Sequence, residues 1–446
     1  MTTPYPAPRQ ISNVMRHLEY EEGLAADDPR YVDTLEARGS QILFRTLARR
    51  FGWWDGTVAA PLQKHMLFFG HLGSGKTTEL RHYAMEFNNS GLFCAIEVNV
   101  NAELDRNNLQ FPDILMAMAK ALLDHLQSEA IVIGDAQLRP LYDWFASTVQ
   151  TRLSEHALSA EVKTGAEAAL SIPFLGKLFA AATTSFRTGA TYRNEIRNEI
   201  RNSYGQLAKA FNDFLAFAEQ ALDAKRSVKR VLFILDGTDK LRDEDSQRLF
   251  VSDVAQMSLV NALVIYAAPL HLAYEENVGG RLDHVVLPMI KIIERDGQPC
   301  AAGRTALTQM LLRRADRSLF ADDATLTALI DACGGHPREL LRLLKYCCEF
   351  ADTTIDLAVV GQAICELAAE YRRFLEPDDY AVLVAKDADQ QHGGNDKRSK
   401  DLLYRLVLLE YNSGSWQRSH PVVRTLEGYI RAQVKSQAPQ GAEQGS

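Results

Sequence analysis

The sequence has few cysteines, and none has the spacing of a metal site. Six cysteines are spread over 446 residues, without a C-x-x-C pair. They are Cys94, Cys300, Cys333, Cys347, Cys348 and Cys365. This pattern argues against a disulfide framework and against a zinc cluster. We therefore expect reduced, mostly buried thiols in a cytoplasmic protein.

Long hydrophobic runs are also missing. The most apolar stretch, 168–183, is interrupted by Pro173 and Lys177. It falls short of the ~20 residues that a helix needs to cross a bilayer. The first ten residues contain three prolines and no apolar core, which argues against a signal peptide. We expect no membrane segment.

Positive charge is not in excess, because the formal net charge is −8. An acidic total argues against broad coating of nucleic acid, although a local basic face can still bind DNA. The length suggests two or three domains, at about 100 to 200 residues per domain.

A glycine-rich motif follows an apolar run that ends at Phe69. Residues 70–77 read G-H-L-G-S-G-K-T, and a plausible helix continues from Thr77. In such a loop the backbone N–H groups surround a phosphate, Lys76 reaches the β and γ phosphates, and Thr77 offers its hydroxyl to Mg²⁺. The expected phosphate contacts are Gly70, Gly73, Ser74, Gly75, Lys76, Thr77 and Thr78. The motif predicts binding of a nucleoside triphosphate.

Two carboxylates follow a second apolar run, 231–235. Asp236 closes this run, where a parallel sheet would place a carboxylate beside the phosphate loop to hold Mg²⁺. Asp239 comes three residues later and is a candidate for orienting or deprotonating the attacking water. An ordinary turn after a strand is the alternative interpretation of this Asp-Gly pair.

Strands and helices alternate along the first two thirds of the chain, which predicts a three-layer α/β domain with a parallel sheet. Helices dominate after Arg304. The expected strands are Met66–Phe69, Leu92–Val100, Val231–Leu235, Ala262–Ala267 and Val285–Leu287. Punctuation by proline and glycine suggests a hairpin-like insertion at 159–190, and one long helix is expected from Thr191 to Ala224.

The chain end has the pattern of a winged helix. Helical segments precede two strand-like runs, which flank the turn residues 412–415. Arg398, Lys400 and Arg405 lie where a DNA-reading helix would be, but Asp396 and Asp401 interleave with them.

The order of these motifs resembles the STAND ATPases, signalling relatives of the AAA+ proteins, and their NACHT branch in particular. In that branch the motif that corresponds to 236–240 is usually Asp-Gly-x-Asp-Glu, whereas the last position is Lys240 here. In addition, no polar side chain ends the run 265–269, where AAA+ motors place one. The resemblance therefore implies slow ATP hydrolysis, with ATP and Mg²⁺ as ligands.

The resemblance also assigns roles outside the phosphate loop. Gly335-His336-Pro337 fits a Gly-x-Pro that lies against base and ribose. Arg338 matches a sensor arginine of the origin-recognition branch of AAA+ proteins. His420 matches a histidine that touches the ADP phosphate in the resting state, although Pro421 departs from the usual acidic residue. For Pro337 and Arg338 the alternative is an ordinary helix N-terminus. For His420 the alternative is an ordinary structural histidine.

Two further sets of arginines are candidates for a role, although each could simply form a solvated helix face. Arg313, Arg314 and Arg317 are candidates for an arginine finger acting on a neighbouring subunit. Arg193, Arg197 and Arg201 recur every four residues beside glutamates, which suggests a salt-bridged surface stripe.

These observations give one division of the chain and two functional hypotheses. The expected parts are an N-terminal extension (1–40), a P-loop NTPase domain (41–295), a helical lid (296–360), a winged-helix domain (361–434) and a disordered tail (435–446). The first hypothesis is a nucleotide-gated, homo-oligomerising switch with a separate effector protein, which by resemblance is the ATPase component of a bacterial antiphage system. The alternative is a DNA-binding AAA+ ATPase of the origin-recognition or transposition-helper type.

Overall fold

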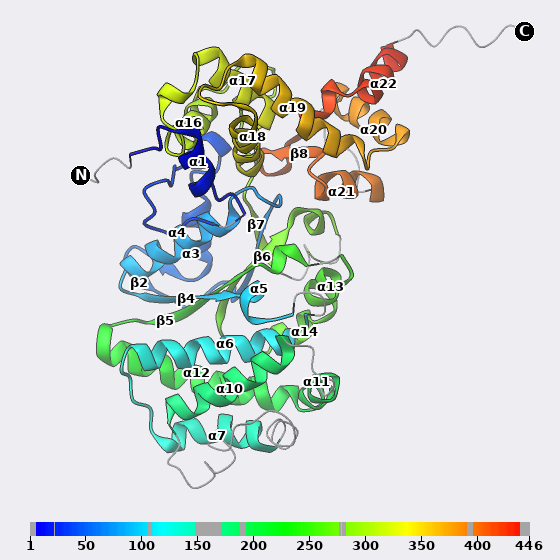
Figure 1. Ribbon diagram of the computed structural model, residues 1–446. Helices are drawn as coiled ribbons and strands as arrows, with labels where there is room; N and C mark the ends of the chain where they lie inside the picture. Colours follow the sequence, from blue (N-terminus) through cyan, green and yellow to red (C-terminus); the bar gives the residue numbers. More distant parts are fainter. Residues whose placement is uncertain are drawn as a thin grey trace, which may run out of the picture.

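The computed structural model describes residues 6–21, 23–105, 109–147, 171–187, 193–241, 243–275, 278, 282–389 and 396–437. Figure 1 shows a sheet with helices on both faces, a helical part packed above it, and a last part with a small hairpin. The fold class predicted from the sequence is confirmed. Among the described residues, no helix is long and apolar enough to cross a membrane.

The central sheet is parallel throughout, with the order β4-β5-β6-β3-β7. Its strands are β3 (His65–Gly70), β4 (Phe93–Asn99), β5 (Arg230–Asp236), β6 (Leu263–Pro269) and β7 (Asp283–Val286). All five overlap strands expected from the sequence. The central strands β5, β6 and β3 are buried along almost their whole length, as continuous apolar runs predict.

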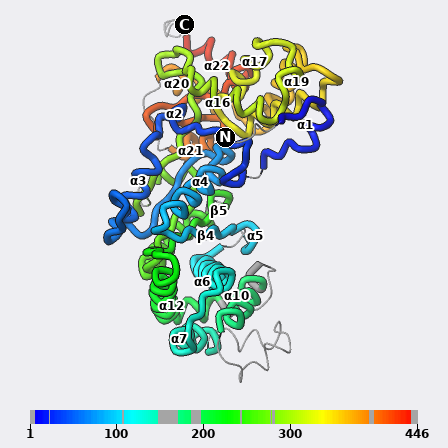
Figure 2. The backbone as a smooth tube through the Cα atoms, turned by 90° about the vertical axis from the view of Figure 1, so that its left-hand side faces the viewer, coloured from blue at the N-terminus to red at the C-terminus, as the bar shows by residue number. Residues whose placement is uncertain are grey.

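Alternate residues of each strand face opposite sides of the sheet. Phe68 packs in a core with α3 (Leu43–Arg50) and α4 (Lys76–Asn89), whereas its neighbour Leu67 belongs to the core under α6 (Phe111–Ser128) and α12 (Tyr204–Arg226). Figures 1 and 2 show these two helical layers on either side of the strands. The sheet is thereby covered on both faces.

The described part of the segment predicted as a hairpin-like insertion, 171–187, is helical instead. Helix α10 (Ile172–Arg187) lies beside α6, and α7 (Asp135–Phe145) packs on α12. The buried positions 175, 178, 179 and 182 follow the period of a helix, and Pro173 is tolerated because it falls in the first turn. Residues 159–170 and 188–190 of the predicted insertion lie outside the described part of the chain.

The single helix expected at 191–224 is two helices. Helix α11 (Arg193–Asn202) is separated by Ser203 from α12. The predicted surface stripe is also wrong at its centre, because Arg197 is buried and forms an ion pair with Asp113 of α6. Arg201 lies 4.0 Å from Asp253.

The helical lid follows the sheet. It contains α16 (Ala301–Leu312), α17 (Asp323–Cys333), α18 (Pro337–Phe350) and α19 (Leu357–Arg372). Helix α19 packs on α17 and α18, so the boundary predicted at 360/361 is wrong because it cuts this helix.

The last part holds α20 (Pro377–Ala388), α21 (Lys397–Tyr404), β8 (Leu408–Tyr411), β9 (Trp416–Ser419) and α22 (Glu427–Gln437). Strands β8 and β9 form the antiparallel hairpin expected from the turn at 412–415. Helix α22 continues to Gln437, so the start of the tail predicted as disordered is helical.

The remaining α-helices and strands of the described residues are short. They are α1 (Ile11–His17), α2 (Leu35–Arg38), β1 (Trp53–Trp54), β2 (Thr57–Val58), α5 (Val100–Glu103), α13 (Asp243–Gln247) and α14 (Val254–Met257). All six cysteines are free thiols, and Cys365 alone among them is exposed.

Candidate functional site

The phosphate loop joins the end of β3 to the start of α4. Its glycines Gly73 and Gly75 have φ values of 80° and 98°, a left-handed conformation that favours glycine. A Cβ atom on Gly73 would lie 2.7 Å from Nε of Arg338 and 2.8 Å from Cε1 of His336. Glycine at this position therefore lets the lid approach the loop closely.

Lys76 is buried in the centre of the site. Its Nζ lies 2.7 Å from a carboxylate oxygen of Asp239 and donates to the backbone carbonyls of Gly70 and His71, each at 2.8 Å. Burial lowers the pKa of Lys76, and the nearby Asp239 opposes this effect. The two motifs predicted from the sequence thus meet at one ion pair.

Thr77 and Asp236 form the second link between the motifs. The Thr77 hydroxyl donates to Asp236 Oδ1 at 2.8 Å. Burial raises the pKa of Asp236, which the Thr77 hydrogen bond partly offsets. These oxygen donors suit Mg²⁺, which also keeps phosphate oxygens and water as ligands. The described residues contain no cluster of three or more histidine, cysteine, aspartate or glutamate side chains that could hold a metal alone.

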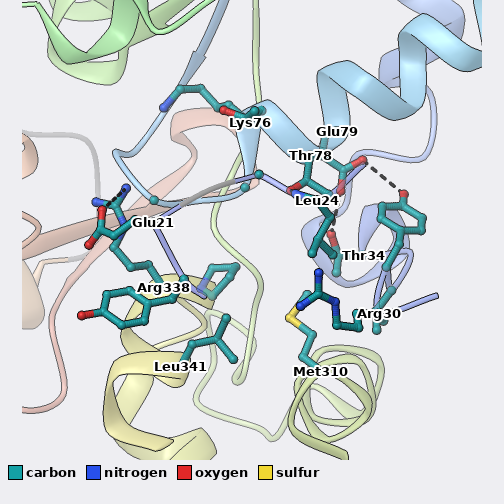
Figure 3. A pocket seen from close by; sticks show the side chains of 18 of the residues that line it. Glu21, Leu24, Arg30, Thr34, Lys76, Thr78, Glu79, Met310, Arg338 and Leu341 are labelled. Carbon is teal, nitrogen blue, oxygen red and sulfur yellow. Dashed lines mark hydrogen bonds and ion pairs between the residues drawn. The ribbon is translucent and has the colours of Figure 1, made fainter. Parts of the chain in front are cut away.

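A cavity lies beside the phosphate loop and is lined by five separate stretches of the chain (Figure 3). From the loop and the start of α4 come Gly73, Gly75, Lys76, Thr77, Thr78 and Glu79, with Asp239 and Lys240 beside them. The lid contributes Met310, Arg314, Pro337, Arg338 and Leu341. The N-terminal part contributes Glu19, Tyr20, Glu21, Gly23, Leu24, Arg30, Tyr31, Val32, Thr34 and Arg38.

The N-terminal contribution was not foreseen from the sequence. The backbone N–H of Leu24 donates to the Thr78 hydroxyl at 3.1 Å, and Arg81 donates to the carbonyl of Gly23. Glu21 lies 3.9 Å from Arg338 of the lid. The N-terminal segment therefore contacts both the phosphate-loop helix and the lid. No motif in residues 6–38 signals this, apart from an isolated glycine at 23.

Arg38 is a second residue that the sequence did not reveal. This buried arginine donates to the carbonyl of Ser74 at 2.7 Å and to the Thr34 hydroxyl at 2.8 Å, and it also donates to the carbonyl of Pro288. Burial lowers its pKa, while the nearby Glu79 raises it. Arg38 thus ties the phosphate loop to the segment after β7.

The lid reaches the loop through the start of α18. His336 caps this helix by accepting from the backbone N–H of Glu339 at 3.1 Å, and its Nε2 lies 2.9 Å from the carbonyl of Leu72. Because Nδ1 accepts, Nε2 carries the proton and donates to Leu72. Burial lowers the pKa of His336 well below its usual range, which keeps this neutral form. Pro337 and Arg338, the residues predicted to contact nucleotide, follow directly and line the cavity.

His420 does not line the cavity. It is fully buried, stacks on Tyr371 with ring centroids 5.1 Å apart, and accepts from the backbone N–H of Val422 at 3.3 Å. Burial lowers its pKa to about 3. Contact between His420 and a phosphate stays a prediction that would require a different arrangement of the C-terminal part.

The candidate finger arginines divide between the cavity and the lid. Arg314 lines the cavity of its own chain. Arg313 donates to the carbonyl of Pro29 at 3.3 Å, and Arg317 pairs with Asp323 at 2.8 Å. Action on a neighbouring subunit stays a prediction for all three.

The basic side chains of α21 are paired with carboxylates. Arg398 lies 3.3 Å from Asp378, Lys400 lies 2.8 Å from Glu275 of the sheet domain, and Arg405 lies 3.0 Å from Asp401. Each of these charges is therefore at least partly neutralised within the chain.

Comparisons with known proteins give only a distant likeness. No protein-family profile and no curated protein matches the chain. The Walker-type ATPase PABY2304 of Pyrococcus abyssi is 12% identical, with a TM-score of 0.40 over 91% of this chain and 97% of that one. Cdc6p from Pyrobaculum aerophilum is 12% identical, with a TM-score of 0.38 over 92% of this chain and 98% of that one. Likenesses at this level carry no argument about activity.

Proposed function

We propose that the chain is an ATP-binding, slowly hydrolysing P-loop ATPase that works as a nucleotide-gated switch. The observation that carries the proposal is the cavity at Lys76, which phosphate loop, N-terminal segment and lid line together. A ligand that contacts all three parts differently in two states can shift their arrangement. A small molecule bound here would therefore contact segments that are far apart in the sequence, and it could change how they are arranged.

The residues of the site divide the work of binding and hydrolysis. Lys76 would exchange Asp239 and two backbone carbonyls for the phosphate oxygens, and Thr77 with Asp236 would hold Mg²⁺. Mg²⁺ supplies neutralisation of the charge that develops on the transferred phosphoryl group. Asp239, released from Lys76, would then orient the attacking water.

Two features favour slow turnover. Lys240 follows Asp239 where a second acidic residue would strengthen water activation, and β6 ends in Ala267, Ala268 and Pro269 without a polar side chain. A site that holds its nucleotide for a long time suits a switch better than a motor. The proposed output is assembly of copies of this chain and engagement of a separate effector, in a bacterial antiphage system.

DNA binding through α21 is the second candidate, and the ion pairs of Arg398, Lys400 and Arg405 count against it in this arrangement. Counterion release from DNA requires basic side chains that can reach phosphates. Retention on a DNA column at low salt, lost when Arg398 and Lys400 are both neutralised, would favour this candidate over the switch.

Calorimetry and size-exclusion chromatography test the main proposal. We expect ADP and a non-hydrolysable ATP analogue to bind with Mg²⁺, and the apparent mass to differ between them. Lys76→Ala should abolish binding of both nucleotides. A constant mass in every nucleotide state, with the partner protein present as well as absent, would exclude the switch.

A further inference from the structure

The C-terminal hairpin is hydrogen-bonded directly to the phosphate loop. The backbone N–H of Glu410, in β8, donates to Nε2 of His71 at 2.9 Å. His71 is the second residue of the loop and is 1% exposed, while Glu410 is 3% exposed. These residues are 339 positions apart in the sequence, so this contact joins two parts of the molecule rather than two turns of one element.

Further contacts hold the same residue of β8 in place. The backbone carbonyl of Glu410 accepts from Met289 at 3.1 Å, and its carboxylate is hydrogen-bonded to Tyr274. Tyr274 in turn accepts from Gln417 of β9 at 2.7 Å. The position of β8 against the sheet domain is therefore well defined at Glu410.

The hydrogen bond requires a neutral imidazole. Nε2 of His71 accepts, so it carries no proton. Burial lowers the pKa of His71 to about 3, and the charge of Lys76 acts in the same direction. A hydrogen bond to the backbone carbonyl of Leu403, in α21, acts in the opposite direction on the pKa of this ring. The imidazole thus lies among groups of the C-terminal part, away from bulk water.

The backbone of His71 is at the same time part of the phosphate site, because its carbonyl accepts from Lys76 at 2.8 Å. A bound phosphate attracts Lys76 and competes with this carbonyl. One residue therefore contacts the nucleotide-binding lysine through its backbone and the C-terminal hairpin through its side chain.

We propose that His71 is a positioning residue that couples the nucleotide site to the docking of the β8–β9 hairpin. Docked β8 fixes the loop through the imidazole, and a nucleotide that draws Lys76 from the His71 carbonyl weakens that docking. This inference rests on the proposed function, because it names the contact through which the nucleotide site would affect the C-terminal part. By thermodynamic reciprocity, breaking the link must change nucleotide affinity and hairpin docking together.

A matched pair of variants separates coupling from simple packing. His71→Met removes the acceptor but keeps an unbranched side chain of similar length, whereas His71→Gln restores an oxygen at about the reach of Nε2. His71→Asn, which is polar but too short, replaces the methionine variant if that one does not fold. His65→Met is the control, because His65 is buried in β3 and bonds Tyr266 and Val260, not the C-terminal part.

Hydrogen–deuterium exchange of the peptide 406–412, with and without ADP and Mg²⁺, gives the readout, and calorimetry gives the ADP affinity. In His71→Met we expect about tenfold faster exchange of this peptide without nucleotide. The ADP dissociation constant of His71→Met should fall, because the docked hairpin opposes nucleotide binding. His71→Gln should stay close to wild type in both measurements. His65→Met should lower overall stability while leaving the ADP affinity unchanged.

Equal exchange and equal ADP affinity in the methionine and glutamine variants would overturn the proposed coupling. So would faster exchange in His71→Met with an unchanged ADP affinity, because His71 would then be a packing residue only. If wild-type protein binds no ADP, the proposed function fails and the coupling fails with it; ADP binding without a difference between the variants removes only the coupling.

Discussion

At the scale of single residues, Lys76 is the point where the two predicted motifs meet. Its three acceptors are one carboxylate and two backbone carbonyls, which are also groups that a phosphate must displace. The ion pair with Asp239 is buried on both sides, so neither partner is stabilised by bulk water. Binding of nucleotide and release of Asp239 are therefore expected to be one event.

Asp239→Asn tests this exchange. The amide keeps the shape of the side chain but no longer forms an ion pair with Lys76, so ADP should bind at least as tightly as to wild type. Hydrolysis should fall about 100-fold, because the group that orients water is no longer a base. Calorimetry and single-turnover phosphate release measure the two effects. Normal turnover in the variant would show that Asp239 has no such role, and Asp243→Asn, a few residues further on, is the control.

At the scale of elements, the N-terminal segment closes one side of the cavity, although no motif in its sequence predicts a binding site. Gly23 lies against Thr77, and a Cβ atom there would be 2.4 Å from Cγ2 of the threonine. The carbonyl of Gly23 accepts from Arg81, which fixes the segment on α4. Thr77 is thus positioned by Asp236 on one side and by this segment on the other.

Gly23→Ala should therefore weaken nucleotide binding in the presence of Mg²⁺. The added methyl group forces either the segment or Thr77 to move, and we expect the dissociation constant of ADP with Mg²⁺ to rise about tenfold, equivalent to about 1.4 kcal/mol. Gly361→Ala is the control, because a Cβ atom on Gly361 meets no atom within 4 Å. Equal affinities in the two variants would mean that the segment does not support the site.

The sequence predicted those elements whose pattern is local. Strands β3, β5 and β6 lie in continuous apolar runs, and the turn residues 412–415 predicted the hairpin of β8 and β9. The helix α10 was missed because Pro173 and Gly176 are breakers in most contexts but are tolerated here, near the start of a helix with a buried face. A local pattern does not contain that tertiary information.

The candidate site divides in the same way. The phosphate loop and Asp236 lie at strand ends, and parallel pairing brings the ends of β3 and β5 to one edge of the sheet. In contrast, Arg38 and Gly23 act through contacts with Ser74 and Thr77 that depend on how the N-terminal segment crosses the loop. Such long-range contacts have no periodic or motif signal in one sequence.

At the scale of the whole molecule, buried histidines accumulate where the three parts meet. His71 is in the phosphate loop, His336 starts the lid helix α18, and His420 follows β9. All three are at most 1% exposed, and burial lowers the pKa of each. Closure of the molecule around the phosphate loop therefore depends on imidazoles that stay neutral.

This arrangement makes the closed state sensitive to acid. An unfolded histidine has a pKa of about 6.5, whereas folding lowers the pKa of His71 and of His420 to about 3. Between these values the unfolded chain binds protons that the folded chain does not, so stability is fully present above pH 6.5 and falls as the pH decreases. Each such histidine adds up to about 1.4 kcal/mol per pH unit to this slope.

His420→Gln measures one contribution. Buried carboxyls such as Glu79 and Glu410 have raised pKa values and act in the opposite direction, so the difference between variant and wild type is the useful quantity. We expect urea unfolding between pH 6 and pH 4 to show a slope reduced by about 1.4 kcal/mol per pH unit in the variant. The same replacement at the exposed His17 should leave the slope unchanged. A wild-type slope in His420→Gln would mean that His420 is protonated in the folded protein, and its stacking on Tyr371 would then need another explanation.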